Sequence, residues 1–252
     1  MRRWLVGLAL WMVIAPASSA EVRVAVAANF LAPLQELAQV FEGQGGPALR
    51  ISTGATGHHY AQIVSGAPFD VFLAADQVRP QRLVQEGLAV VGSRFTYAEG
   101  GLVLWGRPEA GLPESGFNGL ARHGVRRLAI ANPRLAPYGL AAQQALQATG
   151  QWEALVPRVV QGQSVGQTLQ YLATGNASHA LVAASYVHMD GRPAGPLLAV
   201  PADLHEPIRQ DAVQLVNAPN PTGAAAFLRF LQSDRAAAVM AGFGYTPPGK
   251  RE

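Results

Sequence analysis

Short apolar runs alternate with helical patterns along the first part of the chain. Each apolar run has the length of a strand, and apolar residues at helical spacing follow it. This order is typical of a parallel sheet whose strands are joined by crossover helices. The strands are expected at 22–28, 48–52 and 69–75, and the helices at 32–42, 60–66 and 77–87.

The same alternation resumes after residue 100. Strands are expected at 101–105, 126–131, 157–161, 179–184 and 211–216, and helices at 140–150, 165–175 and, as a longer and a shorter one, within 222–244. We therefore predict two α/β lobes, each a mostly parallel sheet flanked by helices. Lobe 1 comprises residues 21–100 and 210–252, and lobe 2 comprises 101–209. Two lobes imply a cleft between them, which is a common place for a ligand.

The first 20 residues have the pattern of a secretory signal peptide. Arg2 and Arg3 precede a short apolar run, and small residues end the segment at Ala20. The run is too short to span a bilayer well, which disfavours a membrane anchor. Because no cysteine follows the cleavage site, a lipid anchor is excluded. We expect export to the periplasm.

Composition and charge remove several classes of function. The chain has 252 residues, of which 49% are apolar and 14% charged, which is typical of a globular protein. It has no cysteine, so disulfides, thiolate metal sites and cysteine nucleophiles are excluded. Of 19 basic residues two lie in the predicted leader, which leaves one more than the 16 acidic residues. No nucleic-acid-binding surface is expected.

One polar loop, STGATG at 52–57, lies between a predicted strand and a helix. Ligands of open α/β sheets bind at such strand ends, and a helix start offers free N–H groups to an anion. Thr56 adds a hydroxyl, and Gly57 permits close approach to the backbone. The loop lacks the Gly-Lys-Ser/Thr ending of a nucleotide-binding P-loop. His58 and His59 follow; adjacent residues diverge on a helix, so we expect two exposed histidines rather than a metal site, which stays an alternative.

Three further stretches repeat this strand-to-helix geometry. They contain Ala28 and Asn29 in AANFL, Tyr138 in APYGL, and Val165 in QGQSVGQTL. Asn29 is expected to cap its helix or to donate to an anion, and Tyr138 to offer its N–H, its phenol or both. Val165 offers a backbone N–H at a helix start.

Two other patterns suggest enzymes. GQSVG at 162–166 matches the G-x-S-x-G nucleophile elbow, so a secreted serine hydrolase using Ser164 is an alternative. Asp190, Asp203 and His205 follow it as candidate partners. Asp70 and Asp76 flank a predicted strand, where a helix cap and a structural role are favoured over acid–base chemistry.

Taken together, these stretches resemble the periplasmic molybdate-binding proteins, the solute receptors of molybdate ABC transporters. The resemblance runs from about residue 22 to 246, and SGAPFDVFLAADQ and AGFGY also contribute to it. It implies a two-lobed, type II-like periplasmic binding protein with the ligand in the cleft. It further implies a monomer without enzymatic activity or cofactor, which passes molybdate, and tungstate as well, to a membrane ABC permease. A receptor for another tetrahedral oxyanion such as sulfate stays an alternative.

The resemblance also assigns the ligand-binding residues. Asn29, Thr56, Tyr138 and Val165 are expected to bind the oxyanion, and Ala28 and Gly57 are weaker candidates. No other metal site is expected, since molybdenum would enter only as molybdate. One position departs from the family: some members have a ligand-binding tyrosine where this chain has Ala183.

Overall fold

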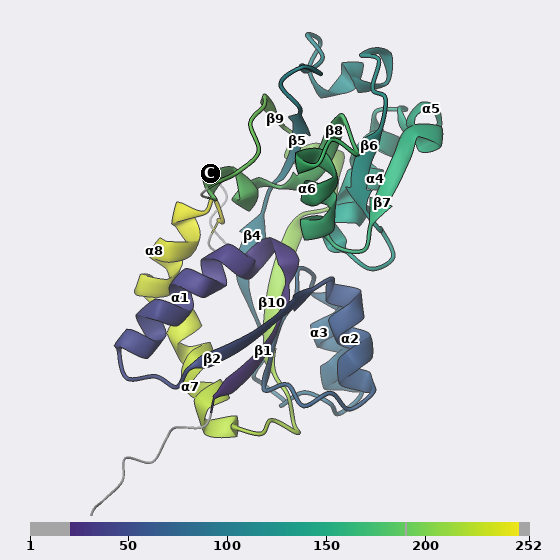
Figure 1. Cartoon of the computed structure of the whole chain (residues 1–252). Coiled ribbons are helices and arrows are strands. Elements are labelled where there is room, and N and C mark those ends of the chain that lie inside the picture. Colours follow the sequence, from purple (N-terminus) through teal and green to yellow (C-terminus); the bar gives the residue numbers. More distant parts are fainter. Residues whose placement is uncertain (1–20, 190, 247–252) are drawn as a thin grey trace, which may run out of the picture.

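The computed structural model describes residues 21–189 and 191–246, arranged as two lobes, one above the other in the view of Figure 1, with one sheet in each. The predicted leader at 1–20 and Asp190 lie outside the described residues. Both sheets have five strands, in the orders β2-β1-β3-β10-β4 and β7-β6-β8-β5-β9. This arrangement confirms the predicted two-lobed α/β class.

The first sheet is mixed. Its strands are β1 (Val22–Ala27), β2 (Leu49–Gly54), β3 (Val71–Leu73), β4 (Phe95–Gly100) and β10 (Ile208–Gln214). β1 pairs in parallel with β2 and with β3, whereas β10 runs antiparallel to β3 and to β4. The parallel part directs the ends of β1, β2 and β3 toward the second lobe.

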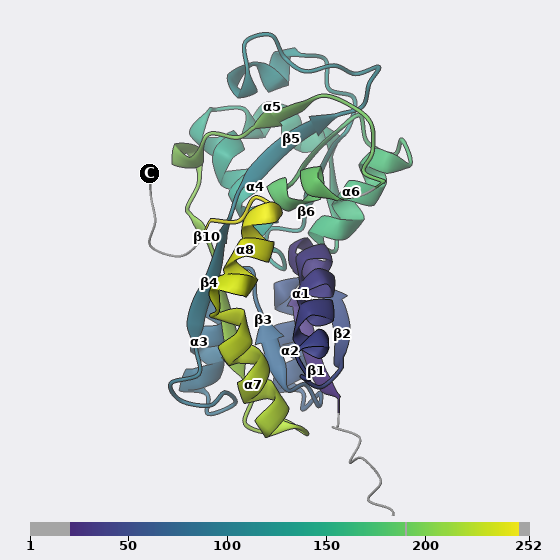
Figure 2. The same ribbon diagram turned by 90° about the vertical axis from the view of Figure 1, so that its left-hand side faces the viewer.

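Helices cover both faces of the first sheet (Figures 1 and 2). One face packs against α1 (Leu31–Gly43), α7 (Pro221–Leu231) and α8 (Asp234–Gly242). The other face packs against α2 (Thr56–Val64) and α3 (Val78–Gln85). Buried aliphatic and aromatic residues fill both layers, so the central strand β3 is apolar on both faces, as the sequence pattern indicates.

The second sheet has the same mixed character. Its strands are β5 (Leu102–Gly106), β6 (Leu128–Ala131), β7 (Val159–Gly162), β8 (His179–Ala183) and β9 (Leu197–Ala199). The flanking α-helices are α4 (Pro137–Ala148), α5 (Trp152–Leu155) and α6 (Val165–Ala173). Short 3₁₀ helices are η1 (Ala28–Phe30), η2 (Phe117–Arg122), η3 (Val156–Arg158), η4 (Ala184–His188) and η5 (Ala202–Leu204).

Two strands, β4 and β9, were not predicted. The sheets are less parallel than expected because β10 and β5 run opposite to their neighbours. β6 is parallel to β7 and β8, but β5 is antiparallel to β8 and β9. β4 contains Thr96, Glu99 and Gly100, which weaken its strand pattern, and β9 has three residues. Both are outer strands of their sheets, where partial exposure permits polar residues.

The chain passes between the lobes along two adjacent strands. β4 ends at Gly100, and β5 begins two residues later in the other sheet (Figure 2). The chain returns through β10, where Ile208 pairs with Gly100. The register of β10 shifts between Gln210 and Asp211, which marks a bulge beside this crossing. The paired strands β4 and β10 therefore form the connection about which the lobes can move.

Candidate functional site

Four helix starts meet at one small cavity of about 10 Å³ between the lobes. η1 and α2 approach it from lobe 1, and α4 and α6 approach it from lobe 2. Its lining residues are Ala27, Ala28, Asn29, Gly54, Ala55, Thr56, Ala75, Ala136, Pro137, Tyr138 and Val165. The structure thus brings together the four residues that the sequence singled out.

The local sequence explains why each helix begins at the cavity. The residue before each helix has an extended backbone: Ala27, Ala55, Ala136 and Ser164. The chain therefore turns from a strand end or loop directly into a helix. The first N–H groups of a helix have no intrahelical acceptor, and the helix dipole places partial positive charge there. Four such ends at one point make a site for a negatively charged group.

Thr56 combines two roles at the start of α2. It is 1% exposed, and its Oγ1 accepts a hydrogen bond from the Ala75 N–H at 3.1 Å. A threonine hydroxyl can accept and donate at once. Its proton is therefore available to an acceptor in the cavity, while the bond to Ala75 fixes the side-chain rotamer.

Asn29 directs its side chain into the protein. The Nδ2 atom donates to Gln210 Oε1 at 2.8 Å and to Tyr245 Oη at 2.9 Å. Both of its amide protons are used by these two bonds. The group that Asn29 can offer to the cavity is therefore its backbone N–H at the start of η1, together with that of Ala28.

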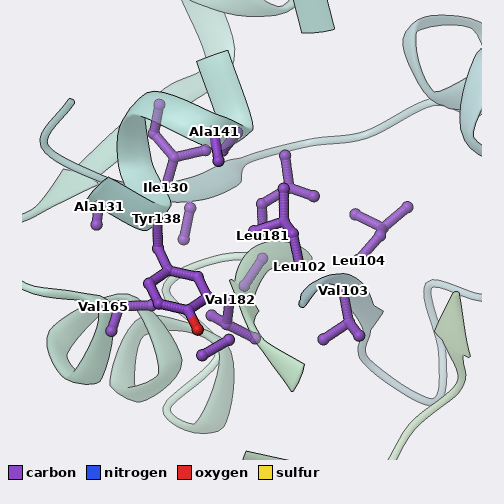
Figure 3. Close-up of a cluster of buried hydrophobic side chains, with 14 of the residues drawn as sticks. Leu102, Val103, Leu104, Ile130, Ala131, Tyr138, Ala141, Val165, Leu181 and Val182 are labelled. Atoms are coloured by element: carbon purple, nitrogen blue, oxygen red, sulfur yellow. The ribbon is translucent and has the colours of Figure 1, made fainter. Parts of the chain in front are cut away.

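Tyr138 lies at the second position of α4, where its N–H has no helical acceptor. Its ring lies beside Val165 among apolar side chains (Figure 3). The phenol oxygen accepts a hydrogen bond from Gln210 Nε2 at 3.3 Å. Burial raises the pKa of the Tyr138 phenol well above its ordinary value, so the group is neutral at physiological pH.

Val165 begins α6, and Ser164 is the residue that caps this helix. Ser164 Oγ accepts a hydrogen bond from the Gln167 N–H at 3.3 Å. His205 Nδ1 contacts the Glu206 carbonyl, and within residues 21–189 and 191–246 no hydrogen bond joins it to Ser164. The elbow-like motif is thus a helix cap, and the Val165 N–H at the first position of α6 has no acceptor within the helix.

Gly57 and His59 differ from their expected roles. The Gly57 N–H donates across the cleft to the Leu135 carbonyl at 2.8 Å, so in this conformation it joins the lobes and does not face the cavity. The prediction that both histidines are exposed is wrong for His59, which is 4% exposed. Its ring nitrogens contact the Val26 carbonyl and the Gln62 side chain, and burial lowers its pKa. Among the described residues no group of three or more His, Asp or Glu could hold a metal ion.

Sequence reasoning missed several polar residues around the cavity. Gln210 and Tyr245 accept hydrogen bonds from the Asn29 side chain and so fix its orientation. Tyr245 ends the AGFGY stretch, which contributed to the family resemblance but was given no role there. Ala183 ends β8 and is buried, as its apolar side chain requires. Shortly after it, Ser185 Oγ donates to the Asn29 carbonyl at 2.9 Å, and Tyr186 Oη donates to the Ala28 carbonyl at 3.1 Å.

Comparison with known proteins assigns this chain to a family. A family model described as bacterial extracellular solute-binding protein matches residues 22–246. The chain belongs to that family. It is similar to the molybdate-binding protein ModA of Azotobacter vinelandii, with 44% identity over 97% of both chains, and to that of Rhodobacter capsulatus, with 42% identity over 97% of this chain and 96% of the relative. The solved periplasmic molybdate-binding protein of A. vinelandii superposes with a TM-score of 0.84 at 38% identity, over 90% of this chain and 99% of that one.

These similarities bear on the remaining alternatives. The relatives are solute-binding proteins of transporters and not enzymes, so the hydrolase interpretation of Ser164 is not supported. Solute-binding proteins of this family bind their anion as transported cargo, which is why no cofactor is involved. Among the described residues no helix is long and apolar enough to cross a bilayer.

Proposed function

We propose that this protein binds molybdate, and also tungstate, outside the cytoplasm and delivers it to a membrane ABC permease. The observation that carries the proposal is the convergence of four helix starts and the Thr56 hydroxyl on one cavity. The donors at Ala28, Asn29, Tyr138 and Val165 are backbone N–H groups. This set resembles the site that the sequence predicts.

The chemistry of the donors fits a fully deprotonated tetrahedral dianion. Molybdate has four acceptor oxygens and no proton to donate near neutral pH. Among the described residues that line the cavity none has a charged side chain, so no carboxylate is available to accept a proton from the ligand. A protonated phosphate would leave its own O–H group unpaired there, which is costly. Hydrogen bonds to charged groups are strong, and the helix dipoles offset the negative charge.

The site must distinguish anions of equal charge by their size. Sulfate has the same charge and shape as molybdate but is smaller, so it cannot reach donors of both lobes at once in a cavity fitted to molybdate. Tungstate is nearly the same size as molybdate and should bind. The closed packing around the cavity makes this selection possible, because interiors adjust little to a ligand of the wrong volume.

The transport role follows from the two lobes. The predicted leader at 1–20 supports export, and we infer that the mature protein is a periplasmic monomer. Hydrogen bonds join the lobes around the cavity, from Gly57 to Leu135 and from Tyr186 to Ala28. We infer that an anion closes the lobes about β4 and β10 and that the permease recognises this closed form.

Thermal unfolding at matched ionic strength tests the proposal. The protein, purified after export from an expression host, is compared with molybdate, tungstate, sulfate, phosphate and no anion. A ligand at a hundred times its dissociation constant adds about 2.7 kcal/mol to the free energy of unfolding, which raises Tm by several degrees. Molybdate and tungstate are expected to give this shift, and sulfate and phosphate are not.

Each other result has a defined meaning. A shift with sulfate alone would make the protein a receptor for a smaller oxyanion. Equal shifts with all four anions would indicate general salt stabilisation, and isothermal titration calorimetry would separate that from binding at one site. No shift with any of them would contradict the proposal.

A further inference from the structure

The phenol of Tyr138 reaches out of lobe 2 to the strands that connect the lobes. Tyr138 belongs to α4, which packs in lobe 2, but its hydroxyl lies against Gly100 at the end of β4 and Gln210 on β10. Both residues lie where the chain crosses between the lobes, since Ile208 pairs with Gly100. Tyr138 therefore joins the anion cavity, through its N–H, to the connecting strands, through its phenol.

Gly100 leaves space that the phenol occupies. A Cβ atom at position 100 would overlap Tyr138 Oη severely and would lie 3.2 Å from Cζ of the same ring. It would also lie 2.9 Å from Gln210 Nε2. The backbone of Gly100 has no positive φ angle, so glycine is not required there for conformation. The missing side chain instead makes room for the tyrosine.

Gln210 completes the contact with hydrogen bonds in fixed directions. Its Nε2 donates to Tyr138 Oη at 3.3 Å, and its Oε1 accepts from Asn29 Nδ2 at 2.8 Å and from Tyr97 Oη at 3.1 Å. The side chain is fully buried. Gln210 therefore contacts the ligand-binding turns of both lobes, Asn29 from lobe 1 and Tyr138 from lobe 2.

We propose that Gly100 and Gln210 form a socket for the Tyr138 phenol, and that filling this socket positions the two half-sites for anion binding. The inference rests on the proposed function. Because the socket is on the connecting strands and the phenol is on lobe 2, the contact forms fully when the lobes close. A residue that blocks the socket lowers the closed population, and apparent affinity falls by the same factor.

Substitution of Gly100 tests the socket directly. Gly100→Ala should weaken molybdate binding about tenfold or more, since overpacking of this kind is strongly unfavourable. Gly101→Ala is the matched control, because a Cβ there meets Ala184 Cβ at an ordinary 3.4 Å. Its affinity should stay within about twofold of the parent, since no overpacking arises. Calorimetry gives the affinities, and Tm without anion reports whether each variant is folded.

A double variant separates positioning from loss of structure. Tyr138→Phe alone should weaken binding, because Gln210 Nε2 loses its acceptor. Combined with Gly100→Ala it should restore part of the lost affinity, because it removes the overlapping oxygen. If the hydroxyl instead bound the anion directly, Tyr138→Phe would weaken binding in both backgrounds. The sign of its effect in the Gly100→Ala background therefore decides.

Molybdate binding by the parent protein distinguishes a failure of this proposal from a failure of the proposed function. If the parent binds no molybdate, both proposals fail. If the parent binds and Gly100→Ala binds equally well, or the double variant binds no better than Gly100→Ala, the socket is overturned and the function stands. Should Gly100→Ala not fold, Gln210→Met keeps the volume and removes the amide. It should weaken binding about fivefold or more, and unchanged affinity would overturn the socket.

Discussion

Lobe 1 presents Asn29 and Thr56 to the cavity from a buried hydrogen-bond network, whereas lobe 2 presents Tyr138 and Val165 from an apolar core. Around Asn29 the bonds to Gln210 and Tyr245 are buried. Around Val165 the neighbours are aliphatic and aromatic side chains (Figure 3). The surroundings of Asn29 and Val165 therefore fix their donors by different means: directional polar contacts around Asn29 and close packing around Val165.

This difference predicts how substitutions in each lobe affect stability and anion binding. In the proposed site the donors of lobe 2 are backbone groups, so, apart from the Tyr138 phenol, a side chain matters there mainly through its volume. In lobe 1 the Thr56 hydroxyl is itself a proposed donor, and its bond to Ala75 also satisfies a buried N–H. Changes in lobe 1 should thus affect stability and binding together, and changes in lobe 2 should separate them.

The largest effect is expected when Val165 is replaced by proline. Proline is tolerated at the first position of a helix, and the extended Ser164 backbone suits a residue before proline. Val165→Pro should therefore keep α6 and remove one donor. A hydrogen bond to a charged group contributes about 1.5–3 kcal/mol, so affinity for molybdate should fall about tenfold to a hundredfold in calorimetry.

Val165→Ala is the control for that substitution. Alanine removes more of the side chain but keeps the N–H, so it should lower Tm and leave affinity closer to that of the parent. Equal affinities for the two variants would show that the Val165 N–H is not a donor, which would contradict binding by lobe 2 through its backbone.

Thr56→Val should produce a smaller loss of binding together with a loss of stability. Valine has nearly the same shape but cannot accept from the Ala75 N–H, which lies on a residue only 2% exposed. An unsatisfied buried donor costs about 1–3 kcal/mol, which denaturant unfolding without anion should detect. Affinity should fall about tenfold, the lower end of the range for losing one hydrogen bond to a charged group.

Thr56→Ser keeps the hydroxyl and should preserve both properties better than Thr56→Val. If Thr56→Val lost stability but bound molybdate normally, the hydroxyl would serve only Ala75, and lobe 1 would resemble lobe 2 in binding through its backbone.

The parts of the site predicted from sequence are those that depend on local order. A strand followed by a small or polar residue and then a helix predicts where free N–H groups lie, and this worked for η1, α2, α4 and α6. The two-lobed fold was predicted for the same reason. The resemblance to a family added the ligand, which local order alone does not give.

The parts that were missed depend on contacts between distant residues. Asn29 and Gln210 are 181 residues apart, so no local pattern indicates that Gln210 turns the Asn29 side chain away from the cavity. His59 is buried where its ring contacts the Val26 carbonyl of β1, which is 33 residues away in the sequence. β4 was missed because it is an outer strand of its sheet and its polar residues weaken the apolar pattern.

The smallest effect on binding is expected for Ser164→Ala, which tests whether lobe 2 binds the anion through its backbone alone. The substitution removes the cap that accepts from the Gln167 N–H, which should cost about 1 kcal/mol of stability and lower Tm by a few degrees. Affinity for molybdate should barely change, because the Val165 N–H keeps its place. Ser164→Asp should do the reverse: aspartate caps a helix as well as serine does, but its charge lies one residue from a donor to a dianion. If Ser164→Ala reduced affinity more than Ser164→Asp, the hydroxyl would be a ligand in its own right, and lobe 2 would also bind through a side chain.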